Sequence, residues 1–347
     1  MRCLLFFANI SILALFMSSC SHKVMPGVNA KQSGFLTCLK PKTLSPGDKV
    51  ALLSPAYYTD MENVYKTAEL LQTWGLEPVI GPNVGKTYAE KYAGTVEQRL
   101  SDIKWALDNP DIKAIICNRG GYGVIHLTDI VAQSEFTKNP KWVVGYSDIT
   151  NLHSMLQVAG VMSLHATMSS SLAKGGNDLT STLMRDLIMG KVPEYTIPAH
   201  PQNICGKATG VLVGGNLMTF APLVGSNADV TAFDDIILFI EEVGESMHNI
   251  DRQINMLRLT GALNRCKGII LGEFTDCGHE LGYENVEEMI RQYLVQYNIP
   301  VACGFPAGHD DINLPLVLGA PVTLDVTPEA TRLLFNIQGE KIPVIYK

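Results

Sequence analysis

The feature that most constrains this chain is a regular alternation of short apolar runs with longer amphipathic segments, which begins near residue 49. Apolar runs at 50–53 and 78–80 are too short for helices and are bounded by turn residues, so they predict strands. The segment 61–74 has helical periodicity. A second helix is predicted to begin at Thr95, because Gln98 stands three residues later and completes a capping box. This β-α-β-α order predicts a parallel sheet.

Further apolar runs extend the pattern through the rest of the chain. Those at 114–117, 142–145 and 161–164 are continuous, which is typical of parallel strands covered on both faces. More runs follow in the second half, and the stretch 322–346, with Gly339 as a turn, looks like antiparallel strands. The predicted fold class is therefore α/β: an N-terminal flavodoxin-like domain with a parallel sheet, and a smaller C-terminal α/β domain with a mixed sheet.

The 347 residues exceed one compact core, so we expect two domains. The predicted boundaries are 43–175 for the N-terminal domain and 206–347 for the C-terminal domain. Between them, the glycine-rich break at 174–177 and the three prolines of 193–201 indicate a linker over 176–205 that contains one short helix. No internal repeat is present in the sequence.

The first nineteen residues have the parts of an export signal. A basic residue precedes the apolar stretch 4–17, which is shorter than the roughly 20 residues of a membrane-spanning helix. Ser18 and Ser19 precede Cys20, and this arrangement resembles a bacterial lipoprotein signal, in which the cysteine becomes the acylated N-terminus. We therefore expect removal of the signal peptide, lipidation of Cys20 and a tether over 20–42. Ordinary secretion with an incidental Cys20 is the alternative.

Export places the expected protein at a membrane, as a lipoprotein facing the periplasm or the cell surface. Its 27 basic and 34 acidic side chains give a formal charge of -7, which argues against nucleic acid as a partner. No cysteines form a CxxC pair, and Cys117 and Cys303 lie in apolar runs, where buried free thiols are common. Cys277 and His279 beside Asp276 lack two further ligands at suitable spacing, so we predict no metal site.

Three chemically distinct side chains follow predicted strands at equivalent positions. Ser147 follows the strand at 142–145, Glu241 ends the run 236–240, and His309 follows 301–303 after a short loop. The carboxyl ends of parallel strands form the binding crevice of such sheets. A serine hydroxyl becomes a nucleophile when an imidazole takes its proton and a carboxylate orients that imidazole. The sequence therefore predicts a Ser-Glu-His triad.

The same region offers donors for a developing oxyanion. The backbone N–H of Asp148 follows the serine at a predicted helix N-terminus, and the glycine-rich loop 119–123 can bring a second backbone N–H close. Alternatives stay open from the residues alone. Ser147 and Asp148 could cap a helix, Glu241 could be a solvated strand end, His309 could lie in an ordinary polar loop, and the glycines could cradle a phosphate, although no P-loop lysine follows.

Six ordered motifs, spread over most of the predicted mature chain, resemble the LD-carboxypeptidase family of serine peptidases. That family includes muramoyl-tetrapeptide carboxypeptidases and microcin C self-immunity peptidases. The motifs are Leu44–Asp48 with Ser54–Ala56, Arg119–Gly123, Gly145–Thr150, Gly214–Leu217, Glu241 with Glu242, Glu245 and Ile250–Arg252, and Gly308–His309.

The resemblance implies roles for the matching residues. It makes Ser147 the nucleophile, Glu241 the orienting acid and His309 the general base. Asp148 and a glycine of the loop, Gly121 first, would supply the oxyanion donors. It further implies a homodimer, a site at the domain junction, no metal and no cofactor. The implied reaction removes terminal D-alanine from a murein tetrapeptide, and the candidates for contacting the substrate are Arg119, Asn216 and Arg252.

Two departures from the family pattern leave the substrate open. The chain reads His165-Ala166-Thr167-Met168 where His-Gly-Pro is frequent, and His248-Asn249 where Tyr-Arg is usual. One alternative is a peptidase that inactivates peptide-nucleotide antibiotics. Another is a lipoprotein that binds wall fragments without catalysis. A generic α/β-hydrolase esterase is disfavoured, because Ile149 occupies the last glycine position of its Gly-x-Ser-x-Gly motif.

Overall fold

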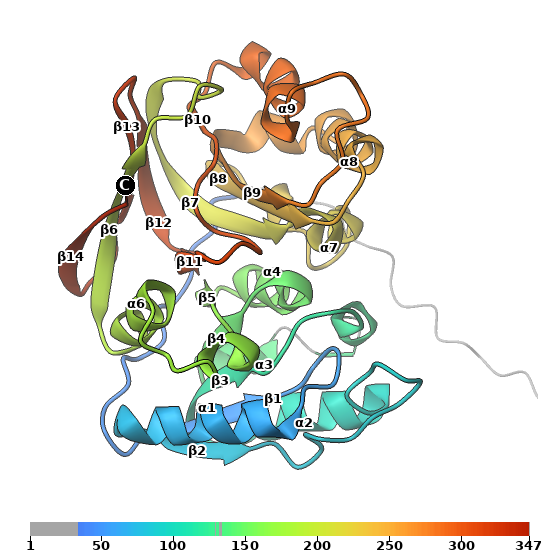
Figure 1. The fold of residues 1–347 in the computed structure, drawn as a ribbon, viewed down its shortest axis with the longest axis vertical. Coiled ribbons are helices and arrows are strands. Elements are labelled where there is room, and N and C mark those ends of the chain that lie inside the picture. The colour runs from blue at the N-terminus through green and yellow to red at the C-terminus, as the bar shows by residue number, and fades with distance from the viewer. Residues whose placement is uncertain (1–33, 129, 132–133, 347) are drawn as a thin grey trace, which may run out of the picture. The chain divides into compact units, whose positions relative to one another are not determined.

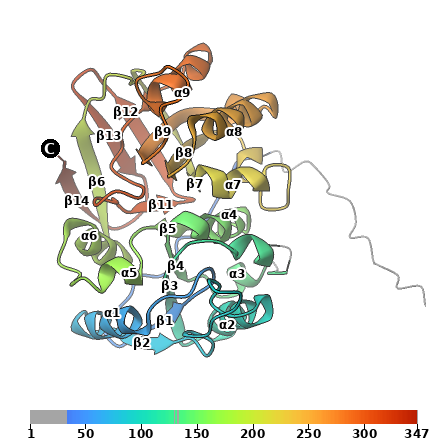
Figure 2. The ribbon, with the colours of Figure 1, turned by 45° about the vertical axis from the view of Figure 1, so that its right-hand side comes forward.

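The computed structural model describes residues 34–128, 130–131 and 134–346, which form two β-sheets with helices packed on them (Figures 1 and 2). The predicted signal peptide, Cys20 and the first part of the tether lie outside the described residues. Among the described residues, no helix combines the length and the apolar character that crossing a membrane requires.

The first sheet has six strands in the order β11-β5-β4-β3-β1-β2. Strands β1 to β5 are parallel and their order is that of flavodoxin-like sheets, as predicted. The edge strand β11 pairs antiparallel with β5. The bounds are β1 Lys49–Leu53, β2 Glu77–Ile80, β3 Ile112–Cys117, β4 Trp142–Gly145, β5 Ser163–His165 and β11 Leu316–Leu318.

Both faces of this sheet are buried, because alternate strand residues enter two separate hydrophobic clusters. In β3, Ala114 and Ile116 belong to one cluster and Ile115 and Cys117 to the other. The first cluster includes apolar side chains from α1 (Met61–Thr73), α5 (Ser169–Leu172) and α6 (Leu179–Ile188). The second includes those from α2 (Val96–Asp108), α3 (Ser134–Lys138) and α4 (Thr150–Val158). The predicted capping box of Thr95 and Gln98 is confirmed at the start of α2.

The second sheet has eight strands in the order β10-β9-β8-β7-β12-β13-β6-β14. Strands β7 to β10 are parallel, whereas β12, β13 and β6 pair antiparallel, so the predicted mixed sheet is confirmed. The strands are β6 Lys191–Pro198, β7 Gly206–Asn216, β8 Ile236–Val243, β9 Cys266–Thr275, β10 Val301–Ala302, β12 Pro321–Val326, β13 Ala330–Phe335 and β14 Glu340–Ile345. The associated α-helices are α7 Leu217–Phe220, α8 Met247–Leu259 and α9 Val286–Leu294.

Short 3-10 helices connect several of these elements. They are η1 Val124–Leu127, η2 Ser147–Ile149, η3 Ala221–Leu223, η4 Val230–Ala232, η5 Ala262–Arg265 and η6 Val295–Tyr297.

The structure differs from the predicted linker over 176–205. This segment contains α6 and β6, and β6 lies inside the second sheet between β13 and β14 (Figure 1). Prolines suggested a loop here, but Val192, Tyr195 and Ile197 are buried, and their packing outweighs the local proline signal. With β6 included, the second sheet has eight strands and the first has six.

The C-terminal stretch also differs in part from its prediction. Strands β12 and β13 form the expected antiparallel pair, but β14 pairs parallel with β6. The chain crosses between the sheets twice more, because β11 leaves the second domain to complete the first sheet beside β5 and β12 then returns to the second sheet (Figure 2). The two domains are therefore joined by more than one connection.

Candidate active site

Ser147 lies at the carboxyl end of β4, on the turn into η2 and α4. Its φ angle is +61°, which is a left-handed conformation that costs a non-glycine residue free energy. Neither η2 nor α4 receives a side-chain cap, so Ser147 and Asp148 do not have the capping role that the sequence left open. A strained serine between a strand and a helix has the geometry of a nucleophile that projects above a sheet.

The glycine-rich loop after β3 lies against this serine. A Cβ atom on Gly120 would lie 2.8 Å from Ser147 Cβ and 3.1 Å from Ser147 Oγ, so only glycine fits there. Gly121 has a φ of +116°, and a Cβ on it would overlap the ring of Tyr57. The loop therefore brings backbone amides next to the serine. The oxyanion roles of Gly121 and Asp148 remain predictions.

Buried polar side chains hold this loop in place. Arg99 from α2 donates to the carbonyl oxygens of Pro55 and Gly123, at 2.8 and 2.7 Å. Asp148, only 4% exposed, accepts from the N–H of Val124 at 2.9 Å, which ties the serine turn to the end of the loop. Burial raises the pKa of Asp148, while the hydrogen bond from Val124 and the charge of Arg99 oppose that shift. Ser147 is thus positioned mainly by main-chain contacts.

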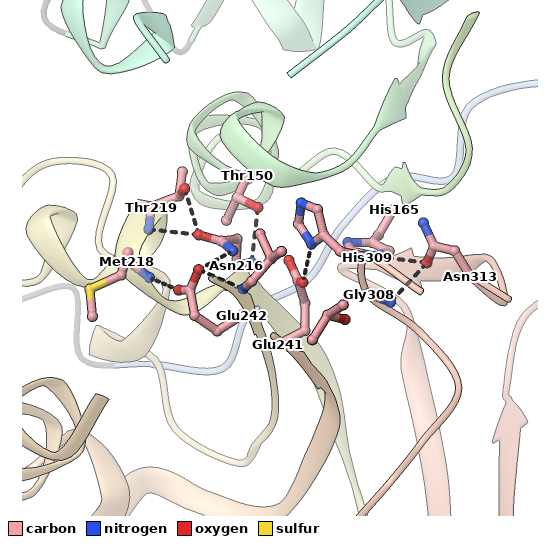
Figure 3. A network of polar contacts seen from close by, with 12 residues as sticks. Thr150, His165, Asn216, Met218, Thr219, Glu241, Glu242, Gly308, His309 and Asn313 are labelled. Atoms are coloured by element: carbon pink, nitrogen blue, oxygen red, sulfur yellow. Dashed lines mark hydrogen bonds and ion pairs between the residues drawn. The ribbon is translucent and has the colours of Figure 1, made fainter. Parts of the chain in front are cut away.

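His309 and Glu241 form a close pair from separate strand ends (Figure 3). His309 Nδ1 lies 2.7 Å from Glu241 Oε2, and Glu241 is fully buried near the end of β8. This contact excludes both the solvated strand end and the ordinary polar loop as alternatives. It also leaves Nε2 of His309 as the nitrogen available for proton transfer. Burial alone would lower the pKa of His309, but the hydrogen bond and charge of Glu241, with Glu242 and Asp310, raise it above its ordinary value.

Tyr146 connects the histidine to the serine turn. Its ring packs edge-on against His309 with the centroids 5.0 Å apart, and Ser147 is the next residue in the chain. In the described part of the chain, no hydrogen bond joins Ser147 Oγ to His309. Catalytic hydrogen bonds often tighten only when substrate binds. The structure therefore brings the three predicted residues to one place without closing the last contact.

Asn313 and His165 support the histidine loop, and sequence reasoning did not assign either a role. Asn313 Oδ1 accepts from the N–H of Gly308 at 3.2 Å and lies 3.1 Å from His165 Nε2 (Figure 3). The main-chain donor at Gly308 fixes which amide atom is the oxygen. His165 is fully buried, and burial first of all lowers its pKa to about 3, so it is neutral. Because Oδ1 accepts, His165 carries its proton on Nε2.

The predicted substrate contacts have different surroundings. Asn216 is buried at the end of β7, where its side chain donates to Glu242 at 2.9 Å and accepts from the N–H of Thr219 at 3.2 Å (Figure 3). Its own N–H donates to Thr150 Oγ1 across the domain junction. Arg252 is exposed on α8 and donates to Asn249.

Arg119, like Arg252, is exposed, and it lies at the start of the glycine-rich loop. Its guanidinium has no hydrogen-bond or ion-pair partner within the described residues. It therefore remains available to a ligand.

Carboxylates gather on the other side of His309. Glu273 on β9 and Asp310, together with Asp311, line a depression next to the histidine. Burial, then the charges of Asp310 and Glu287 and a hydrogen bond with Asp310, raise the pKa of Glu273 to about 7. Glu273 is therefore only partly ionised near neutral pH.

The described residues contain no group of three or more His, Cys, Asp or Glu side chains placed to hold a metal ion. Cys277 is buried and His279 is exposed, and burial raises the pKa of the Cys277 thiol to about 11. All six cysteines in the described segments are free thiols. The chemistry of the arrangement is that of a serine, a histidine and a carboxylate.

Comparison with known proteins finds carboxypeptidases and a self-immunity protein among the relatives of this chain. Curated relatives include a putative carboxypeptidase from Synechocystis sp., 32% identical over 83% of this chain and 94% of the relative. The murein tetrapeptide carboxypeptidase of Pseudomonas aeruginosa is 28% identical over 82% of this chain and 95% of its own length. The microcin C7 self-immunity protein MccF of Escherichia coli is 28% identical over 81% and 92%.

A solved structure and two family models extend the comparison to the fold. The muramoyltetrapeptide carboxypeptidase from Oxalobacter formigenes superposes with a TM-score of 0.73 at 25% identity, covering 85% of this chain and all of that one. The model of the LD-carboxypeptidase N-terminal domain matches residues 50–166, and that of the C-terminal domain matches 209–324. One model matches each of the two domains, and this chain belongs to the LD-carboxypeptidase family.

Proposed function

We propose that this chain is a serine LD-carboxypeptidase that releases the terminal D-alanine of murein tetrapeptides. The observation that carries the proposal is the 2.7 Å contact between His309 Nδ1 and the fully buried Glu241, beside a serine in a left-handed conformation. Family membership and the murein peptide carboxypeptidases among the relatives support the choice of substrate.

In the proposed reaction, Ser147 Oγ attacks the carbonyl carbon of the bond between the diamino acid and D-alanine. His309 Nε2 takes the serine proton, and Glu241 stabilises the imidazolium that forms. The backbone N–H groups of Asp148 and Gly121 receive the oxyanion of the tetrahedral intermediate. His309 then gives the proton to the leaving amine of D-alanine. Water, activated in turn by His309, hydrolyses the acyl-enzyme and frees Ser147.

A carboxypeptidase must also bind the terminal carboxylate of its substrate. Arg119 is exposed beside Gly120, and a guanidinium can hold a carboxylate through two parallel hydrogen bonds. Asn216 is already hydrogen-bonded to Glu242 and Thr219, and Arg252 to Asn249. We therefore propose that these two side chains maintain the shape of the site and do not hold the substrate's carboxylate. We therefore assign the terminal carboxylate to Arg119.

The test is incubation of the purified chain, without residues 1–19, with disaccharide tripeptide, tetrapeptide and pentapeptide, followed by mass analysis. We expect only the tetrapeptide to lose a mass equal to one D-alanine. The Ser147→Ala variant, prepared in parallel, should leave all three unchanged. Failure of the unmodified enzyme to release D-alanine, with a family member active in the same buffer, would reject this substrate. A serine-directed probe that does not label Ser147 would favour a wall-fragment-binding lipoprotein.

A second candidate is the inactivation of a peptide-nucleotide antibiotic, because the chain is also similar to MccF. The segment from His165 to Met168, which departs from the frequent family pattern, is buried behind the histidine loop. Expression in an antibiotic-sensitive host distinguishes the two candidates. Protection that depends on Ser147 would support the second candidate, and unchanged sensitivity would reject it.

We also propose that the protein is exported, lipidated on Cys20 and dimeric. The basis is the sequence pattern ending at Cys20 and the family resemblance. Mass analysis of the mature N-terminus should find acyl groups on Cys20, and Cys20→Ala should move the protein from the membrane fraction to the soluble fraction. Light scattering of the purified chain should give twice the monomer mass. A monomer mass at micromolar concentration would reject the dimer.

A further inference from the structure

The loop 119–123 contains three glycines, so its own sequence does not fix the direction of its backbone N–H groups. Gly121 is exposed and has a φ of +116°. Its N–H donates to no acceptor within the described part of the chain. An oxyanion donor must nevertheless point in one direction before substrate binds, because its effect depends on preorganisation. A neighbouring residue must therefore orient this peptide group.

Tyr57, which lies after β1, contacts the loop through its main chain. Its N–H donates to the carbonyl oxygen of Gly120 at 3.3 Å. A peptide unit is planar and trans, so the carbonyl of Gly120 and the N–H of Gly121 point in opposite directions. The hydrogen bond therefore turns the Gly121 N–H away from Tyr57. In the reversed orientation, the N–H groups of Gly121 and Tyr57 would face each other and the bond would be lost.

The ring of Tyr57 fills the space behind Gly121. A Cβ atom on Gly121 would lie 2.3 Å from Cδ2 and 2.4 Å from Cγ of Tyr57, so the ring packs directly against the glycine. Next to it, a Cβ atom on Gly120 would lie 3.1 Å from Ser147 Oγ. The two glycines are thus confined between the Tyr57 ring and Ser147.

The ring of Tyr57 is itself held in place. Tyr92 packs edge-on against it, with the ring centroids 5.8 Å apart and the ring planes at 77°. Two backbone hydrogen bonds, of 2.8 and 3.0 Å, join the residues on either side of Tyr57 to those on either side of Tyr92. The buried guanidinium of Arg99 lies over the Tyr92 ring, 5.3 Å from its centroid. Tyr57 is therefore a fixed support for the loop.

We propose that Tyr57 is a positioning residue, which orients the Gly120–Gly121 peptide so that the Gly121 N–H faces the oxyanion formed at Ser147. The inference rests on the proposed function, because it names a further residue for the same reaction. The main-chain hydrogen bond selects the direction of the peptide, and the ring keeps the loop from moving back. Loss of the ring lowers the rate of the chemical step and leaves substrate binding nearly unchanged, since the oxyanion exists only during the reaction.

The experiment measures kcat and KM for D-alanine release. Tyr57→Ala removes the ring and should lower kcat by about 10- to 100-fold with little change in KM, because one oxyanion donor accounts for about 10²- to 10³-fold. Tyr57→Phe keeps the ring and should retain kcat. The matched control is Tyr58→Ala, which removes the exposed ring of the next residue and should also retain it. An unchanged kcat in Tyr57→Ala, or an equal loss in Tyr57→Phe, would overturn the proposal.

Melting curves distinguish positioning from a purely structural role. A Tyr57→Ala protein that melts at a lower temperature but keeps its kcat would overturn the proposal. If Tyr57→Ala did not fold, Tyr57→Leu takes its place, because leucine fills part of the same space without a flat ring to pack on Gly121. The same loss of kcat is expected, and full activity of Tyr57→Leu would count against the role of the ring.

A fluorophosphonate probe tests the role of Tyr57 without a murein substrate. Ser147 Oγ bonds to phosphorus, fluoride leaves, the serine proton passes to His309, and the phosphonyl oxygen takes the place of the oxyanion. The labelling rate should fall by about 10- to 100-fold in Tyr57→Ala and stay unchanged in Tyr57→Phe.

The labelling rates also separate this proposal from the choice of substrate. If the unmodified chain were labelled but released no D-alanine, the murein substrate would be rejected, while a slower labelling of Tyr57→Ala would still support the positioning role. Equal labelling rates of Tyr57→Ala and the unmodified chain would overturn that role even if D-alanine were released.

Discussion

The two halves of the candidate active site are built in different ways. In the first domain, Ser147 is fixed by backbone conformation, by the close approach of Gly120, and by the buried contacts of Arg99 and Asp148 with main-chain atoms. In the second domain, the positions of Glu241 and His309 depend on a contact between two ionisable side chains.

The first half of the site therefore depends on backbone geometry, and the second half depends on the charges of two side chains. Changes in the first half should alter rate and stability through steric fit, with little effect on pH dependence. Changes in the second half should move the pH profile, because the proton affinity of His309 depends on Glu241. The predictions below test that separation.

The largest effect is expected at Ser147. Ser147→Ala should lower kcat by about 10⁴- to 10⁶-fold while leaving the melting temperature nearly unchanged, because alanine keeps the same strained backbone. Ser147→Gly should be equally inactive but more stable by about 1 kcal/mol, since glycine adopts a φ of +61° freely. Calorimetric melting and D-alanine release measure both quantities.

The matched control for this prediction is Ser154→Ala in α4. Ser154 is buried about two turns further along, and its hydroxyl has no partner among the described residues. The Ser154→Ala variant should retain activity. If Ser147→Gly were less stable than the unmodified chain, the left-handed turn would not be a source of strain.

Glu241→Gln should lower kcat by about 10⁴-fold, because the imidazolium loses its counter-charge. The fold should be retained, since Glu241 Oε1 has no donor among the described residues and the amide NH₂ can occupy that side. Neutral His309 is the base, so activity falls as the pH drops through its raised pKa. Removing the Glu241 charge lowers that pKa, and the acid limb of the pH profile should move to lower pH.

Glu242→Gln is the contrasting variant. Glu242 accepts from Asn216, Met218 and Val243, so an amide NH₂ there must oppose one of these donors. We expect a larger loss of stability and a smaller shift of the acid limb than for Glu241→Gln. If the two variants shifted the acid limb of the pH profile equally, the pKa of His309 would not be set mainly by Glu241.

Gly120→Ala should lower kcat by about 10²-fold with no shift in the pH profile. The added methyl group would lie 2.8 Å from Ser147 Cβ, and the serine or the loop must move to accommodate it. Gly34→Ala, at a position with no atom within 4 Å of the added Cβ, serves as the control. A shifted pH profile in Gly120→Ala would mean that the loop beside Ser147 also affects the protonation of His309.

The smallest effect is expected at Glu273, whose pKa is raised to about 7 from an ordinary 4.5. Between these pH values the unfolded chain loses the proton while the folded chain keeps it, so stability falls as pH rises. Glu273→Gln should remove that slope and raise the melting temperature by about 2 °C at pH 8, with no gain at pH 4. Melting curves across this range are the measurement, and an unchanged slope would contradict the assignment.

Most of the fold could be predicted because its signals are local. Continuous apolar strands, helices between them and the capping box at Thr95 are all visible within short windows of sequence. The wrong linker over 176–205 shows the limit of such signals. Prolines in β6 suggested a loop, whereas the burial of Tyr195 depends on partners far away in the chain.

The site could be predicted only where topology and chemistry coincide. Ser147 and His309 each follow a strand and Glu241 lies near the end of β8, so the rule for parallel sheets selects them. Asn313 does not follow that rule, because its role comes from a contact with His165, which is 148 positions away. Gly120 was part of a visible motif, but its approach to Ser147 depends on how two loops pack.

Strand β11 has a consequence for how the protein is made. Residues 316–318 complete the sheet that carries Ser147, yet they are synthesised after five of the eight strands of the second sheet. Until they arrive, the edge of β5 has unpaired backbone groups that can pair with other chains. The first domain therefore cannot finish folding as an independent unit during synthesis, and fragments that end before Leu316 should aggregate.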